Sequence, residues 1–159
     1  MEGIRKLEVK DKNLVFEFLQ KEWGDTVIVL REGEIFALKD EEGFVIFDNN
    51  KIIGLLTFRI SHERCEILSL DSKIENQGIG SALIDKAKEY AKLKNCSVLH
   101  VITTNNNLRA IGFYQKRGFH LTKLYINAMD IVRKIKSGVP FVGDNNIPLR
   151  DELEFEINI

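Results

Sequence analysis

The chain has 159 residues, of which 44% are hydrophobic and 30% charged, values typical of one ordinary globular domain. Its 23 basic and 24 acidic residues give a formal net charge of −1, which excludes a global field that would favour nucleic acid or an anionic membrane. No apolar run approaches a membrane span, and the N-terminal segment MEGIRKLEVK lacks the apolar core of a signal peptide. We therefore expect a single domain over residues 1–159, located in the cytoplasm, with no nucleic-acid or membrane partner.

The first half of the chain predicts strands around one helix. Residues 3–9 alternate as a half-buried strand, and the spacing of apolar residues from Asp11 or Lys12 predicts a helix that Gly24 ends. A short strand is expected at 27–30, followed by a loop or one helical turn. Two strands joined at 48–50 are expected to form a hairpin, because Asp and Asn tolerate the positive φ of a tight turn.

The segment 62–72 predicts a third antiparallel strand. Strict alternation would divide its side chains between two faces, with Cys65, Ile67 and Ser69 on one and Glu66, Leu68 and Leu70 on the other. Cys65 and Cys96 are the only cysteines, and each lies in an apolar run. Two buried free thiols fit these positions better than a disulfide, as expected in a reducing compartment.

From residue 75 onwards the chain alternates helices with strands. We expect an amphipathic helix to about Lys94, a central apolar strand at 97–103, and a second helix that residues 105–107 cap and Gly118 ends. Further strands are expected at 119–126 and 152–159. Antiparallel strands followed by a β-α-β-α-β order predict an α/β fold with a mixed sheet and helices on its faces.

The stretch ENQGIGSALIDKA, residues 75–87, places Gly78 and Gly80 where a strand passes directly into a helix. The first amides of a helix lack intrahelical acceptors, and the helix dipole adds partial positive charge, so such a turn can bind an anion. Glycine lets that anion approach the backbone without meeting a Cβ atom. Lys73 is the only basic residue between 65 and 85, so the backbone would hold a pyrophosphate. A purely structural glycine turn, which allows close helix packing, also fits the pattern.

Two nucleotide-binding motifs are excluded. The phosphate loop of nucleoside triphosphatases needs a Gly-Lys pair, and none occurs in the chain. The dinucleotide fingerprint needs a third glycine, and Leu83 occupies that position.

A second block, NNNLRAIGFYQKRGF at residues 105–119, follows the next strand. With the glycine turn it resembles the GCN5-related N-acetyltransferases, which carry a Gln/Arg-x-x-Gly-x-Gly/Ala turn and an Asn-x-x-Ala-x-x-Phe/Leu-Tyr-x-Lys-x-Gly-Phe block. The matching positions are Glu75, Gly78, Gly80, Asn107, Ala110, Phe113, Tyr114, Lys116, Gly118 and Phe119. The resemblance covers residues 43–125 and implies that family's fold, a mostly antiparallel sheet with a splayed parallel strand pair and flanking helices.

The resemblance implies an enzyme that moves the acetyl group of acetyl-CoA to a primary amine of a small molecule or peptide, by direct attack in a ternary complex. The implied coenzyme-binding residues are Ser69, Leu70, Asp71, Glu75, Asn76, Gln77, Gly78, Ile79, Gly80, Ser81, Asn107, Ala110, Phe113, Tyr114 and Lys116. Glu75 departs from the family's Gln or Arg, and its carboxylate would weaken coenzyme affinity unless it turns to solvent. Asn107 looks like the asparagine that contacts the coenzyme arm, and it can also cap its helix.

Two proton transfers accompany this chemistry. The resemblance places Tyr114 at the family's general-acid tyrosine, and a phenol, of ordinary pKa about 10, stays protonated at neutral pH. Freeing the lone pair of a lysine-like amine costs about 4–5 kcal/mol, so a base is useful. Glu66 is the candidate base, with a water chain as the alternative, and His62 and His120 are weaker rivals. His100, inside the central strand, is expected to be a buried and hydrogen-bonded core residue.

The strand that carries Ser69 and Leu70 is expected, as in relatives, to pair with the pantetheine arm through its backbone, with an oxyanion-stabilising amide near Leu70. No metal is implied, because histidines and cysteines lie scattered without ligand spacing. The acceptor amine stays open, with walls expected at 23–38 and 137–157. Residues 138–148 are either a mobile lid or a surface loop.

Other functions fit the same sequence. A non-catalytic module could hold acyl-CoA as a signal, and a self-associating domain could use the glycine turn for structure alone. Pairing of the last strand between chains offers a route to a dimer, so a monomer and a homodimer are both compatible with the sequence.

Overall fold

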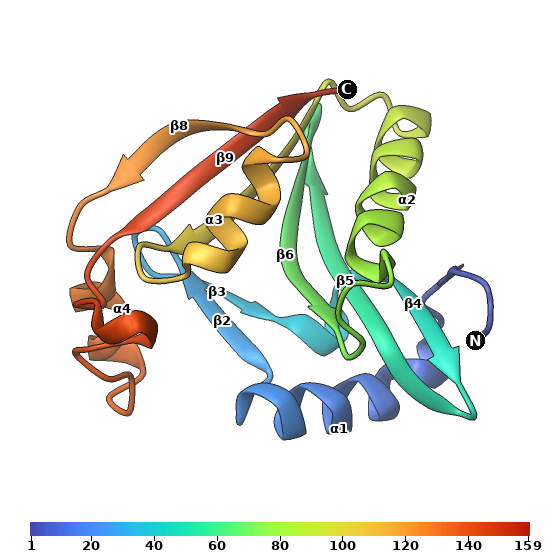
Figure 1. Cartoon of the computed structure of the whole chain (residues 1–159), viewed down its shortest axis with the longest axis horizontal. Helices are drawn as coiled ribbons and strands as arrows, with labels where there is room; N and C mark the ends of the chain where they lie inside the picture. The colour runs from blue at the N-terminus through green and yellow to red at the C-terminus, as the bar shows by residue number, and fades with distance from the viewer. The chain divides into compact units, whose positions relative to one another are not determined.

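The computed structural model describes all 159 residues (Figure 1). They form two compact units. The first unit contains residues 1–28, 36–99 and 159, and the second contains residues 29–35 and 100–158. Both units combine helices with strands. No helix in the chain is long and apolar enough to cross a membrane.

Four strands of the first unit follow one another in the sheet: β1 (Arg5–Lys6), β4 (Glu42–Asp48), β5 (Lys51–Ser61) and β6 (Arg64–Ser72). Each pairs antiparallel with the next, which confirms the predicted series of antiparallel strands. The β4–β5 hairpin closes at Asn49 and Asn50, whose φ angles of 48° and 61° are those expected from the sequence.

The strand expected at 3–9 is shorter than predicted, because a side chain draws the backbone out of the sheet. The buried carboxylate of Asp11 accepts hydrogen bonds from both terminal nitrogens of Arg5, at 2.7 and 2.9 Å. It also accepts one from the amide of Glu8 at 2.8 Å. These bonds stabilise a 3-10 turn at Val9–Asp11 in place of further strand pairing.

Strand β2 (Val27–Leu30) lies where the sequence predicts it, but the following segment does not form the expected loop or helical turn. Residues Glu34–Ala37 form strand β3, which pairs with β2 in a separate two-stranded sheet. A 3-10 turn at Leu38–Asp40 follows, and its first amide donates to the carbonyl of Thr26 at 3.0 Å. A four-residue strand is too short for periodicity to reveal.

Two helices belong to the first unit. Helix α1 (Lys12–Trp23) ends at Gly24, whose φ of 70° supplies the left-handed cap that the sequence predicts. Helix α2 (Ile79–Leu93) packs against β4, β5 and β6 (Figure 1). Cys65 and Cys96 are both free and buried, which confirms the predicted thiols. Burial raises the pKa of Cys65 to about 12, so this thiol is not a nucleophile at neutral pH.

Gly54 on β5 sets how closely α2 approaches the sheet. A Cβ atom at this position would lie 2.7 Å from Cγ2 of Ile79 and 3.2 Å from Cδ1 of Leu83. Since Ile79 is the first residue of α2, Gly54 lies against the start of the helix.

Replacing Gly54 with alanine is expected to lower the free energy of unfolding by about 1–3 kcal/mol, because the added methyl group overpacks the helix–sheet contact. Thermal or urea unfolding measures the change. Gly3→Ala is the matched control, since a Cβ atom there meets nothing within 4 Å. Equal stability of the two variants would show that α2 does not depend on this close approach.

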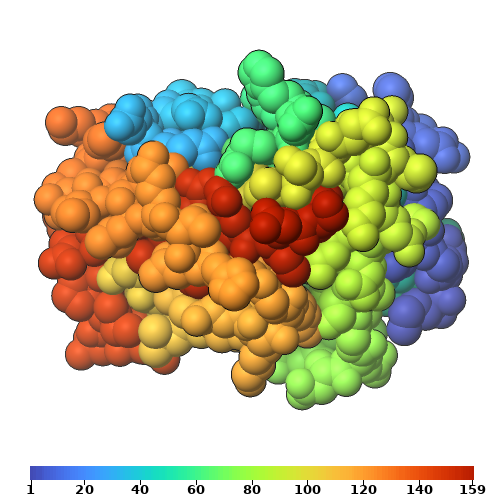
Figure 2. Space-filling model, turned by 90° about the horizontal axis from the view of Figure 1, so that it is seen from above, coloured from blue at the N-terminus to red at the C-terminus, as the bar shows by residue number.

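The second unit contains most of β7 (Val98–Thr104), helix α3 (Leu108–Gln115), β8 (His120–Tyr125), helix α4 (Ala128–Ile135) and β9 (Glu152–Asn158). Strand β9 lies between β7 and β8 and pairs antiparallel with β8, so the two C-terminal strands lie side by side in orange and red in Figure 2. These strands and α3 match the sequence prediction. Helix α4 was not predicted.

The apolar face of α4 accounts for that helix. Met129 and Val132 pack with Val29 in a buried cluster, against which Val139 and Leu149 also lie. The helix therefore forms through tertiary contacts with segments distant in sequence.

Hydrogen bonds and one close backbone contact hold the segment 138–148, for which the sequence allows either a mobile lid or a surface loop. Arg133 of α4 donates from Nη2 to the carbonyl of Pro140 at 2.9 Å, and the amide of Gly143 donates to the carbonyl of Ile147 at 2.9 Å. Gly143 also approaches the side chain of Asn106 so closely that a Cβ atom would collide with it. These contacts hold the segment against α4 and against Asn106.

Candidate functional site

The glycine turn opens α2 as the sequence predicts. Gly78 is the N-cap residue with a φ of 74°, and its carbonyl accepts from the amide of Ala82 at 2.9 Å. Gly78 has no side chain, so no side-chain cap hydrogen bond forms at this N-cap residue. A Cβ atom at Gly78 would meet nothing within 4 Å, whereas Gly54 provides the close helix packing. Gly78 therefore supplies a left-handed turn and open backbone, and packing does not explain it.

Three exposed side chains, those of Glu75, Asn76 and Gln77, precede this turn. Lys73 pairs through Nζ with Oε1 of Glu22 at 2.5 Å. Lys73, the basic residue nearest to the turn in sequence, therefore forms an ion pair with Glu22.

Strand β6 contains a β-bulge that overturns the predicted alternation. Ser69 pairs with Thr57 on β5, whereas Ile67 pairs with the adjacent Phe58, so Leu68 is the extra residue. Because adjacent residues of β5 face opposite sides, Ser69 lies on the face opposite Ile67.

Because of the bulge, the predicted assignment to faces is wrong for both Ser69 and Leu70. Ser69 and Asp71 lie on the face that carries Glu66, and Leu70 lies on the opposite face with Ile67. Glu66 and Ser69 are buried, and the Ser69 hydroxyl hydrogen-bonds the Thr57 hydroxyl at 2.6 Å. The strand before the glycine turn thus presents three polar side chains in a row.

Asp71 at the end of this row contacts α1. The indole Nε1 of Trp23 donates to Oδ1 of Asp71 at 2.8 Å, while Oδ2 is buried and has no hydrogen-bond partner. Burial raises the pKa of Asp71 to about 6, against the lowering effect of the Trp23 hydrogen bond. Nearby Glu22 raises the pKa further, and Lys73 lowers it. The sequence predicts Trp23 in a wall of the acceptor site and Asp71 at the coenzyme, but no sequence pattern indicates that the two side chains touch.

In the second unit, α3 holds Tyr114 in an aromatic cluster. Tyr114 is 5% exposed, and its ring centroid lies 5.3 Å from that of Phe113, 5.4 Å from that of Phe119 and 6.4 Å from that of Phe155. The ring is therefore fixed by packing. Oδ1 of Asn107 accepts from the amide of Ala110 at 3.1 Å, so Asn107 does cap the helix.

His100 is a buried core residue, as predicted. Its Nδ1 lies 2.9 Å from Oε1 of Glu154, whose Oε2 accepts from the hydroxyl of Tyr125 at 2.6 Å. Burial alone would raise the pKa of Glu154, but hydrogen bonds from His100 and Tyr125 outweigh it and lower that pKa to about 2. His62 and His120 are exposed. No group of three or more His, Cys, Asp or Glu side chains is arranged to hold a metal ion.

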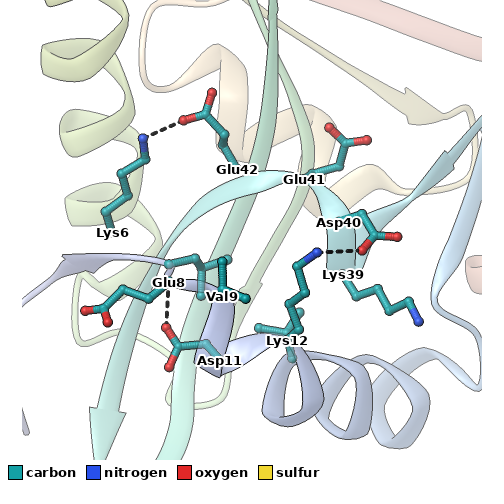
Figure 3. Close-up of a pocket in the computed structure, with 11 residues that line it drawn as sticks. Lys6, Glu8, Val9, Asp11, Lys12, Lys39, Asp40, Glu41 and Glu42 are labelled. Carbon is teal, nitrogen blue, oxygen red and sulfur yellow. Dashed lines mark hydrogen bonds and ion pairs between the residues drawn. The ribbon is translucent and has the colours of Figure 1, made fainter.

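A pocket of about 210 Å³ lies elsewhere in the first unit, between the N-terminal segment, α1 and the start of β4 (Figure 3). Four of its charged lining side chains pair with one another: Lys6 with Glu42 at 2.5 Å and Lys12 with Asp40 at 3.0 Å. Since these charges neutralise one another and no predicted site residue lines the pocket, we do not assign it a ligand.

Each unit carries one part of the predicted site. The first unit brings the β6 residues and the glycine turn together along one continuous segment: Glu66, Ser69, Leu70, Asp71, Glu75, Asn76, Gln77, Gly78, Ile79, Gly80 and Ser81. The second unit holds the residues of the other motif on α3 and its two ends: Asn107, Ala110, Phe113, Tyr114 and Lys116.

The sequence that forms these elements matches a known family of enzymes. The model of the Acetyltransferase (GNAT) family matches residues 9–119, which is more than half of the chain. The chain belongs to the GNAT acetyltransferase family. Among its relatives, the Bacillus subtilis (strain 168) protein YxbD is 46% identical over 143 residues, covering 89% of each chain.

Solved acetyltransferase structures share the fold of this chain. A GNAT family acetyltransferase from Elizabethkingia anophelis, solved with acetyl-CoA bound, is 28% identical, with a TM-score of 0.65 over 77% of this chain and 78% of that chain. A Bacillus subtilis acetyltransferase in complex with CoA is 15% identical, with a TM-score of 0.67 over 98% of this chain and 97% of that chain. These likenesses confirm the predicted mixed α/β fold.

Proposed function

We propose that this GNAT protein is an acetyl-CoA-dependent N-acetyltransferase whose acceptor is a primary amine of a small molecule or peptide. The observation that carries the proposal is the glycine turn at the N-terminus of α2, where Gly78 has a positive φ, makes no side-chain cap hydrogen bond and has open space beyond its Cα. Relatives that hold acetyl-CoA or CoA support the choice of coenzyme. The whole chain, residues 1–159, acts as one catalytic domain.

In this proposal the backbone binds the coenzyme. The amides from Glu75 to Ser81 hold its diphosphate, and each amide-to-phosphate bond contributes roughly 1.5–3 kcal/mol because one partner is charged. Ser69, Leu70 and Asp71 bind the pantetheine arm through their backbone groups, with the Leu70 amide as oxyanion donor. Asn107, Ala110, Phe113 and Lys116 complete the contacts from α3.

Two side chains handle the protons of the reaction. Glu66, directly or through water, accepts one proton from the ammonium form of the acceptor, and the free amine nitrogen then forms a bond to the thioester carbonyl carbon. The carbon–sulfur bond breaks as Tyr114 donates a proton to the leaving thiolate, and the second proton on the attacking nitrogen restores the Tyr114 phenol. Since Cys65 and Cys96 are free and buried, we place this reaction in a reducing compartment, the cytoplasm.

Titration with coenzyme A tests the proposal. At a concentration one hundred times the dissociation constant, coenzyme A should raise the free energy of unfolding by about 2.7 kcal/mol, seen as a higher melting temperature. Polyamines, aminoglycosides, amino acids and peptide N-termini should then be screened for amine-dependent release of coenzyme A from acetyl-CoA. Stabilisation without release by any amine would favour a non-catalytic acyl-CoA-binding module. Absence of stabilisation would favour a structural glycine turn.

A further inference from the structure

The half-buried carboxylate of Asp71 differs from those of the two buried aspartates of the chain. Asp11 is paired with Arg5 and with the amide of Glu8, and Asp151 is paired with Arg150 and with the amide of Asn127. In Asp71 only Oδ1 has a partner, and Oδ2 is buried without one. A buried acceptor without a donor costs about 1–3 kcal/mol, and more when it is charged. A purely structural aspartate does not explain that cost.

The groups around Asp71 leave its charge uncompensated. On α1, Trp23 donates one neutral hydrogen bond, and Glu22 adds a second negative charge. Lys73, the nearby cation, is held by Glu22 at 2.5 Å. The residue opposite Asp71 on β5 is the apolar Leu55. The set formed by Glu22, Asp71 and Lys73 therefore keeps one net negative charge, which a single external cation would balance.

Trp23 gives the same place a second means of holding a cation. Its side chain is 41% exposed although its Nε1 is bound to Asp71, so part of the indole faces solvent. Tryptophan is the aromatic residue that best attracts an ammonium or guanidinium group through cation–π interaction. A carboxylate fixed to an exposed indole is a combination that suits an alkylammonium group.

We propose that Trp23 and Asp71 bind a protonated amino group of the acceptor, so that this enzyme selects cationic amines. The inference rests on the proposed N-acetyltransferase function and names its substrate class. Trp23 lies in the segment expected to wall the acceptor site, and Asp71 lies two residues beyond Ser69 on the same face of β6. In this arrangement the backbone of Asp71 binds the coenzyme, and the side chain of Asp71 binds the acceptor.

The only tryptophan of the chain makes the test direct, because its indole touches the group in question. Tryptophan emission should titrate with a midpoint at about pH 6, the pKa of Asp71. Butylammonium chloride should lower this midpoint, since a cation stabilises the carboxylate form. At saturation, tenfold tighter binding to the carboxylate than to the protonated form gives a shift of about one pH unit. Butanol, and sodium chloride at equal ionic strength, should leave the midpoint unchanged.

Two variants control the assignment. Asp71→Asn should abolish the titration, and Asp85→Asn, which removes an exposed aspartate of α2, should retain it. Should Asp71→Asn fail to fold, the ¹³C shift of the Asp71 carboxyl group in the wild-type protein reports the same midpoint. A midpoint that butylammonium does not change, or a titration that persists in folded Asp71→Asn, would overturn the inference.

Coenzyme A binding separates this result from the proposed function. Asp71→Asn should keep the rise in melting temperature with coenzyme A but lose at least tenfold in kcat/KM for the amine found in the screen. If coenzyme A stabilises the protein but butylammonium does not change the midpoint of the fluorescence titration, only the proposed ammonium site is contradicted. Failure of coenzyme A to stabilise the wild-type protein would instead remove the proposed function.

Discussion

Tyr114→Phe is expected to lower kcat by about 100-fold or more, because a positioned general acid typically contributes a factor of 10² to 10⁴. The dissociation constant for coenzyme A should change little. The Tyr114 ring lies against Phe113, Phe119 and Phe155, and phenylalanine preserves this packing while removing only the hydroxyl. Steady-state kinetics with the amine identified in the screen measures kcat, and thermal shift with coenzyme A measures binding.

The matched control is Tyr125→Phe. Tyr125 is also in the second unit, and its hydroxyl donates a hydrogen bond to Glu154. Loss of this hydroxyl should therefore affect stability more than the chemical step. A folded Tyr114→Phe protein that binds coenzyme A and turns over at the wild-type rate would remove the proposed role of Tyr114.

Gly78→Asp should raise the dissociation constant for coenzyme A about 100-fold. Aspartate is a favourable N-cap residue that tolerates a positive φ, and nothing within 4 Å obstructs its Cβ atom, so α2 should still form. Its carboxylate would occupy the helix N-terminus and repel a diphosphate. The expected loss, about 2.7 kcal/mol, corresponds to roughly two charge-assisted hydrogen bonds.

Gly78→Asn separates charge from shape, since asparagine has the same size and also adopts the left-handed conformation. It should weaken coenzyme binding far less than aspartate. Isothermal titration of both variants with coenzyme A gives the two constants. Equal affinity of Gly78→Asp and the wild-type protein would place the diphosphate away from this turn.

Local sequence patterns predicted the elements whose signals lie close together in the chain. Asn49 and Asn50 supply the positive φ of their hairpin, Gly24 ends α1, and Asn107 caps α3. The glycine turn of α2 was likewise visible, because its geometry depends on residues adjacent to it. For these elements local backbone preference and the final fold agree.

What the sequence could not show depends on contacts between distant segments. The bulge at Leu68 interrupts an apolar run that still looks alternating, so strict alternation places Ser69 on the wrong face. Helix α4 depends on packing with Val29, and Gly54 matters only because α2 crosses it. No spacing rule connects Trp23 with Asp71, since the contact joins a helix end to a strand end.

The most direct measurement is a crystal structure of this protein with coenzyme A bound. The diphosphate is predicted to accept hydrogen bonds from main-chain amides between Glu75 and Ser81, at the first turn of α2. A diphosphate bound at another place, or a turn left without ligand at saturating coenzyme A, would contradict the central claim that backbone at this helix end holds the coenzyme.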